Sequence, residues 1–119
     1  MSYDRKNIFA KILRGEIPCD KVYEDAHVLA LNDINPRRPV HVLVIPKGNY
    51  VCHDDFAAHA SDAEIAGFTR AVAAIARQRG IDESGYRLIV NTGDHGGQEV
   101  PHYHVHIIGG ALVGAMVSD

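Results

Sequence analysis

HYHVHIIGG, at residues 102–110, places three histidines at alternate positions and ends on a pair of glycines. An apolar or aromatic residue between successive histidines gives the period of a β-strand. With a rise of about 3.3 Å per residue, neighbouring imidazoles on one face of such a strand stand about 6.6 Å apart. The intervening residues then point into a core. They are Tyr103, Val105 and Ile107.

A row of imidazoles is rare as a structural device, so His102, His104 and His106 indicate a functional site. Each ring has two polar nitrogens, and both need hydrogen-bond partners when the ring is buried. Each ring is also partly neutral near pH 7, where it can act as a nucleophile, a base or a metal ligand.

The composition is that of an ordinary globular protein. Of the 119 residues, 46% are hydrophobic and 23% are charged, and the net charge is −3 with neutral histidines. We expect a single domain over residues 1–119. The charge balance argues against a broad nucleic-acid surface, which needs clustered Lys and Arg. Binding of a small anionic ligand is still compatible with this charge balance, because it needs only a few local donors.

No long apolar stretch follows the charged N-terminal residues, so we expect neither a signal peptide nor a membrane span. The expected location is the cytoplasm. In that reducing compartment Cys19 and Cys52 are expected to be thiols rather than a disulfide.

Hydrophobic periodicity predicts a mixed order of helices and strands. A short helix is expected near residues 5–14, ending at Gly15. A longer helix is expected after Ser61, because Ser61 and Glu64 have the spacing of a capping box, and it ends at Gly80. The expected strands are residues 21–24, 28–32, 40–45 and 86–91, besides the histidine stretch.

These strands cluster into hairpin-like pairs instead of alternating regularly with helices. The pattern favours an antiparallel sheet with helices on one face, which is the α+β class.

Three interpretations of the histidine row compete on the residues alone. Alternate histidines can hold zinc, with Glu99 or His41 as a further ligand. Histidines can also be satisfied by backbone carbonyls in a core. Finally, a neutral imidazole can attack phosphorus if its other nitrogen is held as a donor and nearby groups bind the phosphoryl oxygens.

The glycine-rich loop before the row, residues 92–99, is a candidate source of such donors. Gly96 and Gly97 can turn successive amides toward an anion, and Asn91 and Gln98 carry amide side chains. The loop leads into a strand, so it is neither a Walker loop nor a dinucleotide fingerprint.

HYHVHII has the pattern of the histidine triad (HIT) superfamily, and the chain resembles the Hint branch of that superfamily. Other segments agree in order over residues 7–110. They are IFAKI (8–12), GEIP (15–18), DINP (33–36), HVLVIPK (41–47), NTG (91–93) and GGQ (96–98). The glycine pair after the triad resembles Hint rather than the diadenosine-polyphosphate hydrolase branch.

The resemblance implies a five-stranded antiparallel sheet with one long and one short helix, in a homodimer. It implies a hydrolase that cleaves the P–N bond of purine nucleoside phosphoramidates of the AMP or GMP type. The reaction passes through a nucleotidyl-histidine, needs no metal or other cofactor, and releases a nucleoside monophosphate. The alternatives are a dinucleoside polyphosphate hydrolase and a purine nucleotide-binding regulatory module with incidental activity.

The same resemblance assigns roles to individual residues. His104 is the nucleophile, His106 binds the phosphoryl group and assists proton transfer, and His102 and His41 orient the row. Asp33 holds the ribose hydroxyls. The residues beside the phosphate are Asn91, Gly97, Gln98 and Glu99, and those that frame the base are Ile8, Phe9, Ile12, Leu31 and Ile34.

Two features depart from related patterns. Many bacterial relatives carry a Cys-x-x-Cys that binds structural zinc, and Asn7 and Ala10 stand there in this chain. Glu99 stands where such members carry Ser, and it can either repel phosphate or bind an amine.

Overall fold

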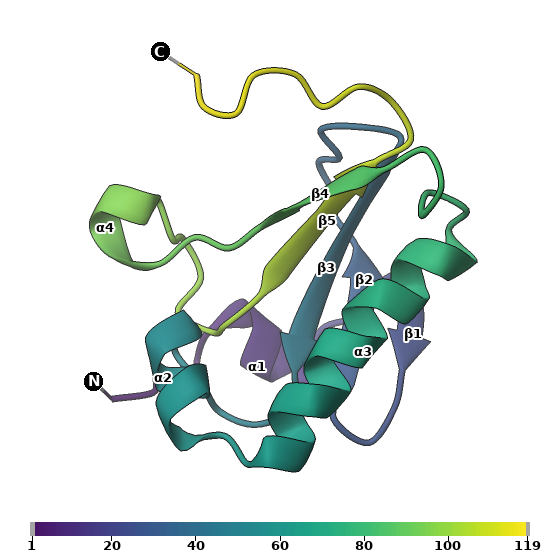
Figure 1. Cartoon of the computed structure of the whole chain (residues 1–119). Coiled ribbons are helices and arrows are strands. Elements are labelled where there is room, and N and C mark those ends of the chain that lie inside the picture. Colours follow the sequence, from purple (N-terminus) through teal and green to yellow (C-terminus); the bar gives the residue numbers. More distant parts are fainter. Residues whose placement is uncertain (1, 119) are drawn as a thin grey trace.

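Five antiparallel strands form one sheet in the order β1-β2-β3-β5-β4 in the computed structural model, which describes residues 2–118 (Figure 1). The strands are β1 (Lys21–Glu24), β2 (Val28–Asn32), β3 (Val40–Pro46), β4 (Tyr86–Ile89) and β5 (Val105–Gly109). The helices are α1 (Ile8–Leu13), α2 (His53–His59), α3 (Asp62–Gln78) and α4 (Gly93–Gly96). The α+β class and the five-stranded antiparallel sheet are thereby confirmed.

The long helix α3 covers one face of the sheet (Figure 1). It begins at the predicted capping box, in which Ser61 Oγ accepts from the Glu64 amide and the Glu64 carboxylate accepts from the Ser61 amide. Its apolar stripe belongs to one buried cluster with Val105 and Ile107 of β5 and with Tyr103 just before it, which point inward as predicted. The buried residues of the stripe are Phe68, Ala71, Val72, Ile75 and Ala76.

The short helix α1 covers the opposite face, so the helices do not all lie on one face as expected. Phe9 of α1 packs on Leu29, Leu31, Leu43 and Ile45 in a second, smaller cluster. Successive side chains of a strand point to opposite faces, and β2 and β3 carry apolar residues at almost every position. Both faces of these two strands therefore need a cover.

Only part of the histidine stretch is a strand, which corrects the expectation of a strand through His102. The ladder between β3 and β5 ends at the pair Val44 and Val105. Beyond it on β3 stands Pro46, which has no N–H to give to a ladder. The chain before Val105 bonds elsewhere: the Tyr103 amide donates to the Tyr50 carbonyl at 2.7 Å.

The other differences are short elements and their ends. The helix α2 was not predicted, and one turn of helix, α4, occupies the predicted loop. The helix α1 begins at Ile8 rather than near residue 5, because Asn7 caps it: Asn7 Oδ1 accepts from the Ala10 amide at 2.9 Å. The strand β4 ends at Ile89, before the predicted residue 91.

Two arginines hold the C-terminal segment against the sheet. Arg38 donates from Nε to the Leu112 carbonyl at 3.0 Å. Arg87 donates to the Gly114 and Ala115 carbonyls at 2.9 and 3.0 Å. Within residues 2–118, none of the helices has the length and apolar character needed to cross a membrane.

Candidate active site

Four histidines gather on the face of the sheet that α1 covers. His41 lies on β3 and His106 opposite Leu43 on β5, while His102 and His104 lie just before β5. His41, His102 and His104 are buried, with 5%, 0% and 7% of their surfaces exposed, and His106 is half-buried. The sequence row thus becomes a cluster, joined by a fourth histidine from a neighbouring strand.

His104 has its proton on one defined nitrogen. Its Nδ1 lies 2.7 Å from the carbonyl oxygen of His102. A carbonyl can only accept, so Nδ1 carries the proton and Nε2 keeps its lone pair. Burial lowers the pKa of His104, which favours this neutral form, although the charges of Asp33 and Glu99 oppose the shift.

His102 is held by a hydrogen bond at each ring nitrogen. Its Nε2 donates to the Pro46 carbonyl at 2.9 Å, and its Nδ1 accepts from the Tyr3 hydroxyl at 2.6 Å. Burial lowers the pKa of His102 to about 4. A neutral ring has one donor and one acceptor, and here each of them has a partner of the matching kind.

His41 and His106 form a second hydrogen-bonded chain, besides the chain that links Tyr3, His102 and His104. The Arg37 amide donates to Nδ1 of His41 at 3.1 Å, so the proton of neutral His41 is on Nε2. That nitrogen lies 2.9 Å from Nδ1 of His106 and donates to it, which leaves the His106 proton on Nε2. Burial lowers the pKa of His41 and brings that of His106 to about 4.

The two hydrogen-bonded chains end at His104 and His106, whose imidazoles are complementary. The ring centroids of His104 and His106 lie 5.2 Å apart. The first ring offers an unprotonated nitrogen and the second a protonated one. A nucleophile with its other nitrogen held as a donor, next to a hydrogen-bond donor, is what attack on a phosphoryl group requires.

Asp33, His41 and His106 bring possible metal-ligating atoms within 4.8 Å of one another. Asp33 Oδ2 lies 3.4 Å from His41 Nε2. A metal there needs a lone pair on His41 Nε2, and the proton then moves to Nδ1. Because Nδ1 already faces the Arg37 N–H, two donors would meet, and the hydrogen bonding of the site opposes metal binding.

The loop before the histidines is held by Gln98. Its Nε2 donates to the Val51 and Val100 carbonyls at 2.7 and 3.0 Å, and its Oε1 accepts from the Gly93 amide at 3.1 Å. The backbone amides of Gly97 and Gln98 donate to carbonyls within the loop, at Asp94 and Gly93. The side chain of Gln98 therefore fixes the shape of the loop.

The remaining expected loop residues differ in exposure. Asn91 is half-buried, and Gly97 and Glu99 are exposed. The effect of the Glu99 charge on the pKa of His104 brings this carboxylate into the electrostatic surroundings of the site.

The residues expected around a base fall into two groups. Phe9 and Leu31 are buried and belong to the small cluster under α1, with Ile12 packed against it. The ring of Phe9 also meets the ring of His104 edge-on, with centroids 5.0 Å apart. Ile8 and Ile34 are 45% and 88% exposed.

Sequence reasoning missed two partners of the histidines, Tyr3 and the Arg37 amide. Tyr3 lies 99 positions from His102, and periodicity reports only neighbours along the chain. The amide of Arg37 belongs to a proline-rich loop whose path no local pattern fixes. No signal in the sequence could have identified either contact.

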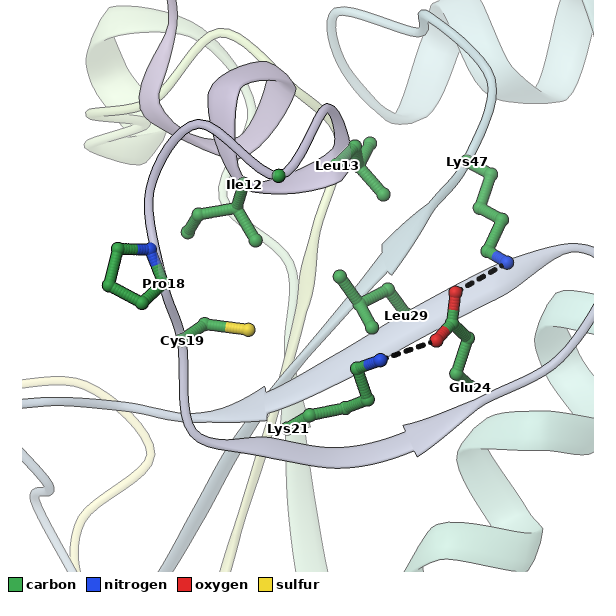
Figure 2. Close-up of a pocket in the computed structure, with 9 residues that line it drawn as sticks. Ile12, Leu13, Pro18, Cys19, Lys21, Glu24, Leu29 and Lys47 are labelled. Carbon is green, nitrogen blue, oxygen red and sulfur yellow. Dashed lines mark hydrogen bonds and ion pairs between the residues drawn. The ribbon is translucent and has the colours of Figure 1, made fainter.

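A hollow of about 480 Å³ lies next to Ile12 (Figure 2). Its apolar wall includes Leu13 and Leu29. At its rim Glu24 accepts from Lys21 and Lys47 at 2.7 and 2.8 Å, and these hydrogen bonds lower the pKa of Glu24 to about 2. The rim therefore carries two lysine ammonium groups around one carboxylate, and both are hydrogen-bonded to it.

Comparison with known proteins finds relatives over nearly the whole chain. The HIT domain family model matches residues 14–112. A HIT-like protein of Azospirillum brasilense is 56% identical over 117 residues, which cover 98% of this chain and 96% of the relative. The purine nucleoside phosphoramidase of Escherichia coli K12 is 46% identical over 113 residues, covering 95% of this chain and 94% of the enzyme.

Solved structures agree. A histidine triad protein from Clostridium difficile superimposes with a TM-score of 0.84 and 41% sequence identity, covering 98% of this chain and all of the other. At such identity the likeness extends to the sequence as well as the fold.

Proposed function

This chain belongs to the HIT domain family, and on that premise we propose that it hydrolyses purine nucleoside phosphoramidates. The observation that carries the proposal is the defined tautomer of His104, with Nδ1 donating to a carbonyl and Nε2 unprotonated. A phosphoramidase from Escherichia coli at 46% identity supports the same substrate class.

In the proposed reaction, His104 Nε2 attacks the phosphorus and forms a nucleotidyl-histidine. The P–N bond breaks with its electron pair on the amine nitrogen, which takes up a proton and leaves as the free amine. Water then attacks the phosphorus and gives up a proton, which balances the proton taken up by the amine; the P–N bond to His104 breaks with its electron pair on Nε2, and a nucleoside monophosphate departs. The positive charge on the substituted imidazole is stabilised by the His102 carbonyl, which accepts from Nδ1.

The other residues have supporting roles in this proposal. His106 binds the phosphoryl group through Nε2–H and assists proton transfer. His41 fixes the tautomer of His106 through their 2.9 Å hydrogen bond. Asp33 binds the ribose hydroxyls through Oδ2, since its Oδ1 already accepts from the Asn35 amide at 2.8 Å.

The substrate is proposed to lie between the loop and α1. Asn91, Gly97 and Glu99 line the phosphate, in a loop whose shape Gln98 maintains. The exposed pair Ile8 and Ile34 covers the purine, and the buried residues Phe9, Ile12 and Leu31 support its floor.

A direct test is to quench a reaction with adenosine phosphoramidate and to search the peptides for a nucleotidyl group. The expected result is AMP attached to the peptide that contains His104, and no adduct in His104→Ala. Guanosine phosphoramidate and a dinucleoside polyphosphate, run in parallel, rank the substrates. Nucleotide binding without turnover of any of them would contradict the proposal.

We also propose that the protein is a homodimer joined at the edge of the sheet. The outer strand β4 and the residue after it expose apolar side chains: Tyr86 and Leu88 of β4 are 37% and 48% accessible, and the following Val90 is 40% accessible. An exposed apolar edge strand is a template for pairing with another chain. Light scattering should give twice the mass of one chain, and Leu88→Lys should halve it; a wild-type monomer would contradict the dimer.

A further inference from the structure

The N-terminal segment reaches the histidine cluster through a single side chain, Tyr3. Its hydroxyl lies 2.6 Å from Nδ1 of His102, and the two rings meet edge-on with centroids 5.5 Å apart. Neither the histidine pattern nor the resemblance gives Tyr3 a role.

A turn holds Tyr3 in place. Asp4 Oδ1 accepts from the Lys6 amide at 2.9 Å, and the Asp4 carbonyl accepts from Nδ2 of Asn7 at 2.8 Å. Asn7 then caps α1, whose Phe9 contacts the ring of His104. The turn that starts α1 therefore also brings the Tyr3 hydroxyl to the buried imidazole.

The direction of the hydrogen bond between Tyr3 and His102 follows from the bond that the other nitrogen of the His102 ring makes. The Pro46 carbonyl can only accept, so His102 donates from Nε2 and must accept at Nδ1. The hydroxyl of Tyr3 is the donor. Two bonds at opposite positions fix both the tautomer and the rotation of the ring about its Cβ–Cγ bond.

His102 also presents the backbone carbonyl that accepts from His104 Nδ1 at 2.7 Å. The backbone of His102 and its ring are anchored together, since the ring is fully buried between Tyr3, Phe9 and Pro46. Any loosening of the ring shifts the carbonyl that keeps the proton of His104 on Nδ1.

We propose that Tyr3 is a positioning residue: its hydroxyl fixes His102, and through the His102 carbonyl it keeps Nε2 of His104 unprotonated and aimed at phosphorus. This inference rests on the proposed function, because the group that it positions is the proposed nucleophile. Tyr3 itself does not touch the substrate.

Tyr3→Phe tests the inference, since it removes one oxygen and keeps the ring. A hydrogen bond of ordinary strength corresponds to about a fivefold effect, so kcat for adenosine phosphoramidate should fall about fivefold with KM unchanged. The matched control is Tyr23→Phe, because the Tyr23 hydroxyl also donates to a side chain, Asp25 Oδ2 at 2.9 Å, but on β1. The control should retain wild-type kcat.

Nitrogen NMR without substrate gives a readout that is independent of turnover. In Tyr3→Phe the Nδ1 resonance of His102 should move, and the Nδ1 proton of His104 should exchange faster with water. Unchanged resonances, or an unchanged kcat in an active enzyme, would overturn the inference. If wild-type protein hydrolyses no phosphoramidate, the proposed function fails, and the NMR readout alone decides whether Tyr3 positions the two histidines.

Discussion

The two faces of the sheet are made from alternate residues of the same strands, yet they do different work. On β3, Val42 and Val44 pack under α3, while Leu43 and Ile45 pack under α1 beside His41. The α3 face is held by apolar contacts that have no direction. The α1 face combines a smaller apolar cluster with hydrogen bonds of the histidine rings, each with a defined donor. Because side chains alternate between the faces, one strand contributes residues to the apolar core on one face and to the histidine site on the other.

Burying four imidazoles is favourable only if their nitrogens find partners. In the part of the chain that the structure describes, no buried side-chain nitrogen or oxygen lacks a hydrogen-bond partner. The buried nitrogens of the histidine face are therefore hydrogen-bonded, and loss of one partner leaves another group unsatisfied. Substitutions on the two faces should consequently differ in whether they change activity or the free energy of unfolding.

The largest expected effect is on activity, from His104→Asn. The Asn amide can still donate to the His102 carbonyl in place of Nδ1, but it has no nucleophile in place of Nε2. We expect kcat/KM for adenosine phosphoramidate to fall by about a thousandfold or more. The free energy of unfolding, measured in urea, should change by only about 1 kcal/mol. Substantial turnover in this folded variant would show that another group attacks phosphorus.

The converse substitution is Ile75→Ala on α3. Ile75 is fully buried in the apolar cluster on the other face. Truncation of such a side chain lowers the free energy of unfolding by about 2–5 kcal/mol. At a temperature where the variant is folded, kcat should stay within about twofold of wild type, because the histidine network lies across the sheet. If Ile75→Ala lowered kcat as well as the free energy of unfolding, the two faces would not be independent.

Much of the α3 face could be predicted from the sequence. The capping box at Ser61, the stop at Gly80 and the inward direction of Tyr103, Val105 and Ile107 all follow from local spacing. What local spacing missed depends on contacts elsewhere. The late start of β5 follows from Pro46 on the opposite strand, and α4 is a single turn that loop composition does not distinguish from irregular chain.

For the α1 face, the sequence predicted the histidines but not the hydrogen-bond partners that are distant in sequence. Alternation identified the three histidines of the row, His41 was considered as a further metal ligand, and the resemblance assigned it an orienting role. The tautomer of His104 follows from the nearby His102 carbonyl, and that of His41 from the Arg37 amide. The tautomer of His102 follows from Tyr3 and Pro46, which lie far from it in sequence. Gln98 shows the same limit in one of its contacts, since its Nε2 donates to the Val51 carbonyl, which only the fold brings near.

A smaller effect should appear in the dependence of stability on pH. The pKa of His102 falls from its ordinary 6.5 to about 4 on folding, so below pH 6.5 the unfolded chain binds more protons than the folded one. Stability that is fully present above pH 6.5 is then lost as the pH falls toward 4. For one such histidine the loss is at most about 1.4 kcal/mol per pH unit.

Urea unfolding at pH 7, 6.5 and 5 measures this slope above the range in which most carboxylates titrate. The comparison variant is His95→Gln, which removes an exposed imidazole rather than a buried one. A wild-type free energy of unfolding that stays constant from pH 7 to 5 would mean that the imidazoles are not buried as neutral rings.

The smallest expected effect compares the caps of the two covering helices. Asn7 Oδ1 accepts from the Ala10 amide at the start of α1, and Ser61 Oγ accepts from the Glu64 amide at the start of α3. Replacing either residue by Ala should lower the free energy of unfolding by about 1 kcal/mol. The loss should be the larger for Asn7→Ala, because this variant also loses the hydrogen bond from Asn7 Nδ2 to the Asp4 carbonyl.

Their effects on activity should differ. Asn7 also holds the Asp4 turn that carries Tyr3, and α1 places Phe9 against His104. Asn7→Ala should lower kcat by about the fivefold that one ordinary hydrogen bond represents, whereas Ser61→Ala should leave kcat as it is. Equal kcat values in the two variants would mean that α1 is only a cover for its face, and that the histidines keep their geometry without it.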